Sequence, residues 1–66
     1  MSKQLGRRLK ALREARGLSR AELATAAGIS REYVRRLEAG AYDPTVGMVQ
    51  KLAKALKVSL AELLLT

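Results

Sequence analysis

The sequence has 66 residues, with 13 Lys and Arg against 6 Asp and Glu and a net charge of +7 at pH 7. We expect a chain this short to form one small domain, residues 1–66. It contains no Cys and no His, which excludes a disulfide scaffold, a zinc finger and a thiol nucleophile and removes the commonest general base. We therefore expect no enzyme, no metal, no cofactor and no small-molecule substrate.

The positive charge is unevenly distributed along the chain. All eight Arg lie between Arg7 and Arg36, whereas residues 45–66 carry three Lys and one Glu, a net charge of +2. Guanidinium groups match phosphates and guanine edges geometrically, so this distribution favours a nucleic-acid partner over charge that serves solubility alone. No apolar run approaches the roughly 20 residues of a membrane span, and no signal peptide precedes the first helical pattern. We expect no membrane partner and a cytoplasmic location.

The first predicted helix covers residues 3–16. Leu5, Leu9 and Leu12 recur at spacings of four and three, which is typical of the buried stripe of an amphipathic helix. Gly17 follows this stripe and can take the left-handed conformation that commonly ends a helix. The charged residues between the leucines then lie on the outer face.

A short second helix is predicted for residues 20–27. Ser19 and Glu22 have the spacing of a capping box, in which each side chain bonds the backbone N–H of the other residue. The helix therefore begins at residue 20. Gly28 interrupts it, because glycine permits a tight turn, and Ser30 can cap the helix that follows.

Three further helices are predicted for residues 31–38, 46–56 and 60–65. Thr45 is a cap for the fourth helix, and Ser59 with Glu62 forms a second capping box for the fifth. No strand pattern, internal repeat or interdomain linker is present in the sequence. The predicted fold is therefore all-α, a compact bundle of five short helices with a central helix-turn-helix.

The second and third helices carry the spacing of that helix-turn-helix. The turn between them is too short to bring them back antiparallel, so they must cross at a steep angle. Ala24 is small enough for a close approach of the two backbones, and Gly28 can take a positive φ. The apolar side chains that would hold the pair on the other helices are Leu23, Ile29, Val34 and Leu37.

Three stretches, LKALREARGLSRAELATAAGIS, RRLEAG and DPTVGMVQKLAKALKVSLAELL, carry a resemblance to a known family. Over about residues 5–65 the chain resembles the phage-repressor-like helix-turn-helix domains of the lambda, Cro and XRE family. The resemblance implies sequence-specific binding to double-stranded DNA, with residues 31–38 in the major groove. It also implies a transcriptional regulator, in particular a repressor that occludes a promoter.

The resemblance places base contacts on the third helix. Since Val34 and Leu37 point inward, helical spacing leaves the opposite face to charged side chains. The candidate base contacts are Arg31, Glu32, Tyr33, Arg35 and Arg36. Arginine can donate to both O6 and N7 of guanine, and a carboxylate can accept from the amino group of cytosine. The alternative is a solvated face whose charges pair with one another. Tyr33 can cover a thymine methyl or a sugar-phosphate edge, or pack at the rim of the helix.

Phosphate contacts are expected from Arg20, Ser30, Thr45 and Gly47. The family usually has Gln at the position of Arg20, where the side chain commonly meets DNA, so Arg20 is expected to contact a phosphate or a guanine. Ser30 and Thr45 are helix caps first, with the N–H groups of each helix N-terminus open to a phosphate. Gly47 is a poor helix former, which indicates either a close approach to the DNA backbone or an accident of sequence.

The resemblance also implies a structural ion pair between Arg13 and Glu38, which would tie the recognition helix to the first helix. A second class of function stays open, because a protein-interaction or antitoxin-like module can use the same fold. A homodimer through the C-terminal leucines is possible as well; these are Leu60, Leu64 and Leu65. The regular caps and the absence of Asn, His and Cys are compatible with an engineered version of the same scaffold.

Overall fold

The computed structural model describes residues 2–41 and 43–64, which form five helices with no strand among them. The helices are α1 (Ser2–Ala15), α2 (Arg20–Ala27), α3 (Arg31–Glu38), α4 (Val46–Leu56) and α5 (Leu60–Leu64). The prediction of an all-α fold with five helices is confirmed. The first helix begins and ends one residue earlier than the predicted 3–16, and residue 65 of the last predicted helix lies outside the described residues.

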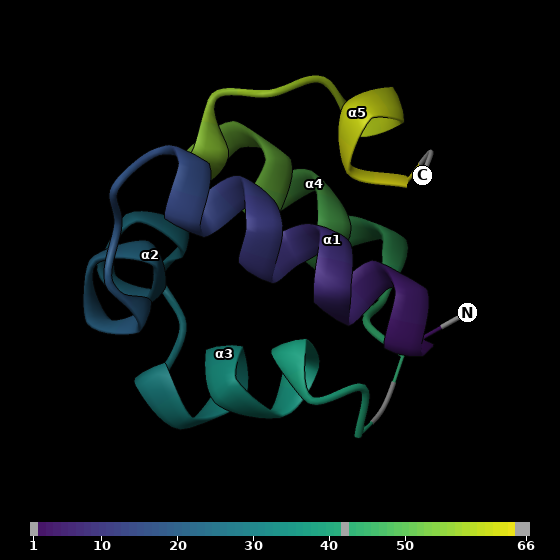
Figure 1. The fold of residues 1–66 in the computed structure, drawn as a ribbon, viewed down its shortest axis with the longest axis horizontal. Coiled ribbons are helices and arrows are strands. Elements are labelled where there is room, and N and C mark those ends of the chain that lie inside the picture. The colour runs from purple at the N-terminus through teal and green to yellow at the C-terminus, as the bar shows by residue number, and fades with distance from the viewer. Residues whose placement is uncertain (1, 42, 65–66) are drawn as a thin grey trace.

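α1 crosses the middle of the molecule in front of α4 in this view (Figure 1). In the same view α2 lies at the left, α3 below and α5 above (Figure 1). α3 packs against α1 and α2, α2 also packs against α4, and α5 packs against α1 and α4. One long side of α3 therefore has no helix over it. No helix within the described residues is long and apolar enough to cross a lipid bilayer.

The core is aliphatic, as the composition requires. Its largest fully buried side chains come from all five helices, and they are Leu9, Leu23, Val34, Leu52, Leu56 and Leu63. Each such side chain removes apolar surface from water, a gain of roughly 1.5–3 kcal/mol. Since the members of this cluster lie on helices distant in sequence, the same core that stabilises the bundle also fixes the position of α3.

Local hydrogen bonds set both the start of α2 and the turn between α2 and α3. Ser19 Oγ accepts from the N–H of Glu22 at 3.0 Å, and the Ser19 N–H donates to Glu22 Oε1 at 2.8 Å, which completes the capping box. Gly28 ends α2 with φ 72°, and the Ile29 N–H donates to the Ala24 carbonyl at 2.9 Å. A positive φ is strained for most residues but not for glycine. The turn is therefore specified by residues within it.

α1 approaches the end of α3 very closely at Gly6. A Cβ atom at this position would lie 2.5 Å from the carbonyl oxygen of Leu37 and 2.7 Å from that of Glu38. Both neighbours are backbone atoms, which cannot rotate away as a flexible side chain can. Glycine is therefore required at this crossing, and it allows α1 to cover the C-terminal end of α3.

Candidate nucleic-acid interface

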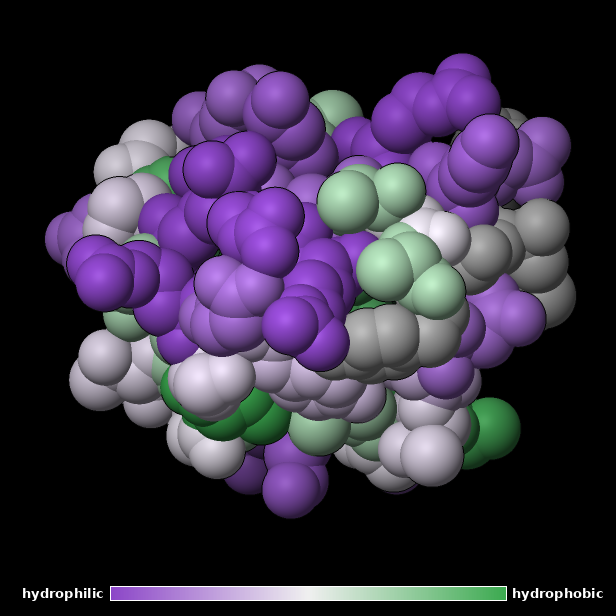
Figure 2. All heavy atoms as spheres, turned by 90° about the horizontal axis from the view of Figure 1, so that it is seen from below, coloured by the Kyte–Doolittle hydropathy of each residue, from purple (hydrophilic) through white to green (hydrophobic). Residues whose placement is uncertain are grey.

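The side of α3 that no helix covers is formed by charged residues. Val34, Leu37 and Glu38 are buried, whereas the outward side chains are exposed, and these are Arg31, Glu32, Arg35 and Arg36. Figure 2 looks onto the molecule from the α3 side and shows hydrophilic side chains gathered over much of it. The structure thus brings four of the five candidate base contacts together on one open surface, which we call the α3 face.

Tyr33, the fifth candidate, has a different environment. Its side chain is half-buried and packs against the hydrophobic core, which is one of the two positions that the sequence left open. The ring therefore lies at the rim of the α3 face and not at its centre.

Within the α3 face, Glu32 accepts hydrogen bonds from two arginines. Arg35 donates from Nε to Glu32 Oε1 at 3.1 Å and from Nη2 to Oε2. Arg36 donates from Nε to Oε2 at 3.0 Å. The three residues lie three and four positions apart on one helix, a spacing that places their side chains side by side. Among the described residues, Arg31 is the one arginine of α3 that forms no ion pair.

These bonds change the titration of the groups that make them. Hydrogen bonds from Arg35 and then from Arg36 lower the pKa of Glu32 from its ordinary value of 4.5 to about 2. The hydrogen bonds that Arg35 donates to Glu32 in turn raise the pKa of Arg35. Because hydrogen bonding to the charged form favours that form, Glu32 is a carboxylate at any pH at which DNA binding would be measured.

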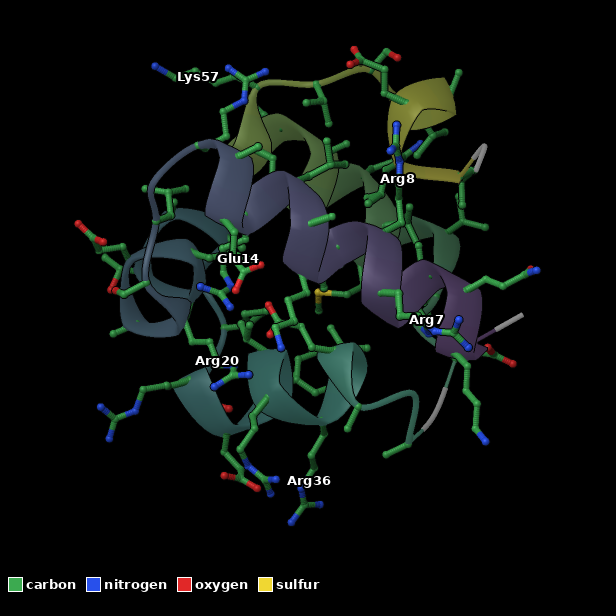
Figure 3. The ribbon with its side chains drawn as sticks, in the orientation of Figure 1. Arg7, Arg8, Glu14, Arg20, Arg36 and Lys57 are labelled. Carbon is green, nitrogen blue, oxygen red and sulfur yellow. The ribbon has the colours of Figure 1, made fainter. Side chains whose placement is uncertain are left out.

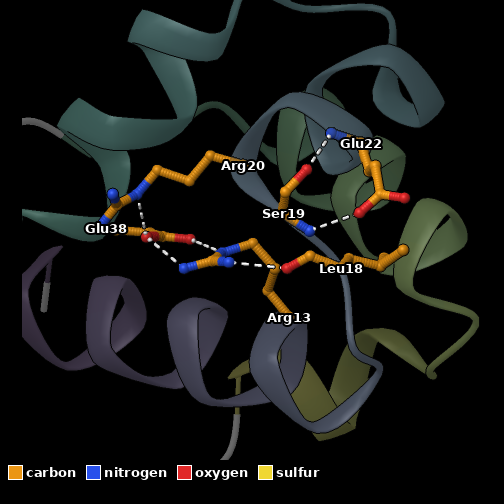
Figure 4. A network of polar contacts seen from close by, with 6 residues as sticks. All are labelled: Arg13, Leu18, Ser19, Arg20, Glu22 and Glu38. Atoms are coloured by element: carbon orange, nitrogen blue, oxygen red, sulfur yellow. Dashed lines mark hydrogen bonds and ion pairs between the residues drawn. The ribbon is translucent and has the colours of Figure 1, made fainter.

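A second carboxylate of α3, that of Glu38, lies on the opposite side of the helix. Arg13 donates to it from Nε at 2.6 Å and from Nη2 at 3.3 Å, and Nη1 of Arg13 donates to the Leu18 carbonyl at 2.7 Å. Arg20 donates from Nε at 2.9 Å. Figure 4 shows the carboxylate between the two guanidinium groups. The network joins α1, α2 and α3, so the orientation of α3 depends on it.

The position of Arg20 is the main feature that the sequence did not indicate. Its guanidinium is held by Glu38 through Nε, while its side chain is 40% exposed. Figure 3 shows that Arg20 lies beside α3, whereas Arg36 extends away from the other helices. Nε faces inward, so the two terminal nitrogens are the donors left for a ligand. Arg20 and Glu38 are 18 positions apart in the sequence, and no local spacing could have identified the pair.

The other candidate phosphate contacts lie at helix N-termini. Ser30 Oγ accepts from the Tyr33 N–H at 3.0 Å, and Thr45 Oγ1 accepts from the Met48 N–H at 3.1 Å, so both residues are N-caps. A Cβ atom at Gly47 would meet only Thr45 Oγ1, at 3.9 Å. Internal packing therefore does not require a glycine at position 47, in contrast to Gly6.

Comparison with known proteins gives the class of this fold. The sequence pattern of the helix-turn-helix family matches residues 9–63. A helix-turn-helix transcriptional regulator of Sinorhizobium fredii is 40% identical over 63 residues, which cover 96% of this chain and 82% of that relative. The immunity repressor protein of Bacillus phage phi105 is 33% identical over 57 residues, which cover 86% of this chain but 40% of the phage protein.

A solved structure agrees with the sequence relatives. The restriction-modification controller protein C.AhdI of Aeromonas hydrophila has a TM-score of 0.90 to this structure at 39% identity, and the match covers 92% of each chain. The chain therefore belongs to the phage-repressor-like helix-turn-helix family, a class of sequence-specific DNA-binding transcription regulators and not of enzymes.

Proposed function

We propose that this protein is a transcriptional repressor that lays α3 in the major groove of double-stranded DNA and blocks a promoter by occupying it. The observation that carries the proposal is the α3 face: four charged side chains on a helix that is otherwise buried against α1 and α2. An exposed helix of this width fits the major groove. Because its ligand would be duplex DNA, we place the protein in the cytoplasm of a bacterial cell, at the host or phage DNA.

The roles of the side chains follow from their positions. Arg31 and Arg36 would read guanine O6 and N7, Arg35 would contact a base or a phosphate, and Glu32 would accept from a cytosine amino group. Arg20 would donate to a phosphate from its two terminal nitrogens. The N–H groups at the N-termini of α3 and α4, capped by Ser30 and Thr45, would meet neighbouring phosphates, and Gly47 would allow the DNA backbone to come close.

Selection from a randomised duplex library at roughly physiological salt tests this function, because non-specific binding is weak there. We expect one enriched motif. Arg36→Ala should relax the preference at one base pair of that motif at a cost of roughly 1–3 kcal/mol. A matched variant is Arg7→Ala, which removes an exposed arginine of α1 and should leave the motif unchanged. Binding without enrichment would contradict the proposal and favour a protein-interaction module.

We also propose that the protein acts as a homodimer through an apolar hollow between the N-terminal half of α1, α4 and α5. The hollow has a volume of about 220 Å³, and its apolar lining residues are Leu5, Pro44, Val46, Val49, Leu60 and Leu64. Val46 is 70% and Leu64 is 43% exposed, and with the other lining residues they form an exposed apolar patch, which is more informative than a single exposed leucine. The predicted contribution of Leu65 lies outside the described residues.

The dimensions of the molecule are compatible with a dimer on DNA. The Cα positions extend over 24 × 22 × 20 Å, so two copies fit side by side on half-sites whose centres lie about 34 Å apart. Sedimentation at two concentrations tests the dimer. Leu64→Glu should abolish concentration-dependent association, whereas Ala26→Glu, which adds the same charge on α2, should not. Equal sedimentation of the wild-type protein at both concentrations would contradict the dimer.

A further inference from the structure

The arginines of the α3 face differ in what already occupies their donors. Both Arg35 and Arg36 donate to Glu32, and all three side chains are more than half exposed. Arg31 forms no ion pair within the described residues. The α3 face of the free protein therefore presents one unengaged guanidinium and two that share a carboxylate.

This arrangement weakens the attraction of the α3 face for phosphates in general. A phosphate that approaches Arg35 or Arg36 must displace the Glu32 carboxylate or lie beside it. Displacement costs the hydrogen bonds within the cluster, and two neighbouring anions repel each other. Non-specific binding to DNA depends almost entirely on phosphate contacts, so it is the binding mode that Glu32 opposes most.

We propose that Glu32 is a specificity-determining residue that holds Arg35 and Arg36 back from phosphates and releases them where the major groove offers its carboxylate a cytosine amino group. This inference rests on the DNA-binding function proposed above and names the group that controls its selectivity. At a matching site the Glu32 carboxylate loses its hydrogen bonds from Arg35 and Arg36 and accepts one from the cytosine amino group. The two arginines then become free to contact guanine or phosphate. At other sites the carboxylate stays unpaired in the groove or keeps its arginines.

The spacing on α3 also relates Glu32 to the bases that Arg36 would read. The two residues lie one helical turn apart on the same face, and their side chains touch through Arg36 Nε and Glu32 Oε2. Side chains that begin one helical turn apart, about 6 Å along the axis, would reach the same or neighbouring base pairs when they enter the groove. The recognised sequence should therefore contain a cytosine next to the guanine that Arg36 reads, or paired with it. Building a penalty against wrong partners is a general way to gain specificity.

The test compares Glu32→Gln with Glu14→Gln on a duplex without the selected motif. Both variants remove one negative charge, but Glu14 is an exposed residue of α1, so the pair separates a local effect from net charge. We expect Glu32→Gln to tighten non-specific binding by roughly tenfold at about 50 mM salt, because the carboxylate that holds Arg35 and Arg36 is gone and the net positive charge of the α3 face rises by one. The slope of log K against log salt should steepen by about one. Glu14→Gln should produce less than half of either change.

A second arm of the experiment uses two duplexes. One carries the selected site, and the other carries the same site with the C·G base pair proposed to contact Glu32 replaced by another base pair. The wild-type protein should prefer the cytosine site by roughly tenfold, and Glu32→Ala, which removes the acceptor oxygens, should lose that preference while it retains the guanine preference of Arg36. Equal effects of the two glutamine variants on the unselected duplex would overturn the proposal, as would an unchanged cytosine preference. The first arm needs no selected motif, so failure of the library selection and failure of this inference are separate results.

A readout of folding accompanies both arms. Glu32 is exposed and within the first turn of α3, and glutamine keeps its length and its acceptor oxygen. The thermal unfolding midpoints of Glu32→Gln and Glu14→Gln should therefore stay close to that of the wild-type protein. Tighter non-specific binding by a variant with an unchanged midpoint would exclude unfolding as its cause.

Discussion

Glu32 and Glu38 lie six positions apart on the same short helix, and each accepts hydrogen bonds from two arginines. The side chain of Glu38 is 2% exposed and that of Glu32 is 53% exposed. The arginines of Glu38 come from α1 and α2, whereas those of Glu32 come from α3 itself. The same chemistry therefore has two consequences: the buried carboxylate holds three helices together, and the exposed one, in the proposal above, would control what the α3 face presents to DNA.

The largest expected effect is that of Glu38→Ala. It leaves the guanidinium of Arg13, whose side chain is 8% exposed, buried without its partner. Removal of one member of a buried ion pair costs about 3–5 kcal/mol, so the free energy of unfolding should fall by that amount or the fold should be lost at 25 °C. Urea denaturation followed by circular dichroism measures it. If Glu32→Ala destabilised the protein as much, burial would not distinguish the two carboxylates.

The next effect in size concerns the contact that buries Glu38. Gly6→Ala places a methyl group against two backbone carbonyl oxygens of α3, and overpacking of this kind typically costs about 1–3 kcal/mol. Gly47→Ala is the matched variant, since open space surrounds that position; it should stabilise the free protein by up to about 1 kcal/mol. Thermal unfolding of both variants makes the comparison. Equal midpoints would contradict the close approach of α1 and α3.

Arg20 belongs both to the buried network of Glu38 and to the exposed surface, because its partly exposed side chain pairs with the buried Glu38 carboxylate. Arg20→Ala should lower the free energy of unfolding by less than Glu38→Ala, up to about 1 kcal/mol for a half-exposed pair. It should weaken binding to all duplexes alike and reduce the salt slope by about one if its terminal nitrogens contact a phosphate. Binding titrations at several salt concentrations measure both. A loss confined to one base pair would contradict the phosphate contact.

The smallest effect is the titration of Glu32. In the folded protein its pKa is lowered to about 2, below the value of about 4.3 for an unfolded chain. The pairing therefore stabilises the fold above the unfolded pKa, and this contribution is lost as the pH falls from about 4.3 toward 2. The carboxyl carbon signal of Glu32 in NMR spectra should titrate with a midpoint of about 2, well below the value of about 4.3 for an unfolded chain. A midpoint of Glu32 near 4 would contradict its pairing with Arg35 and Arg36.

The features that could be predicted from the sequence are those set by neighbouring residues. The Ser19–Glu22 capping box and the positive φ of Gly28 depend on a few consecutive residues, and the structure contains both. The spacing of Val34 and Leu37 indicated which side of α3 is buried for the same reason. Such signals set where a helix begins and ends, and they involve only a few neighbouring residues.

The features that could not be predicted depend on segments distant in sequence or on unusual backbone conformations. Arg20 meets Glu38, and Gly6 meets the end of α3, only because the core brings α1, α2 and α3 together. The bounds of α4 match the predicted 46–56, but the left-handed backbone of Lys57 that follows it, with φ 58°, has no sequence signal because lysine rarely adopts this conformation. The pairing of Glu32 with two arginines was compatible with their spacing, but so were several other arrangements of exposed charges.

The most direct test of the central claim, that the α3 face binds DNA, is a map of backbone amide chemical shifts during titration with the selected duplex. The account predicts the largest changes at the N-terminal turns of α2, α3 and α4, around Arg20, Arg31 and Gly47, with small changes along the apolar hollow beside α5. The largest changes around Leu60 and Leu64, with little change on α3, would contradict it.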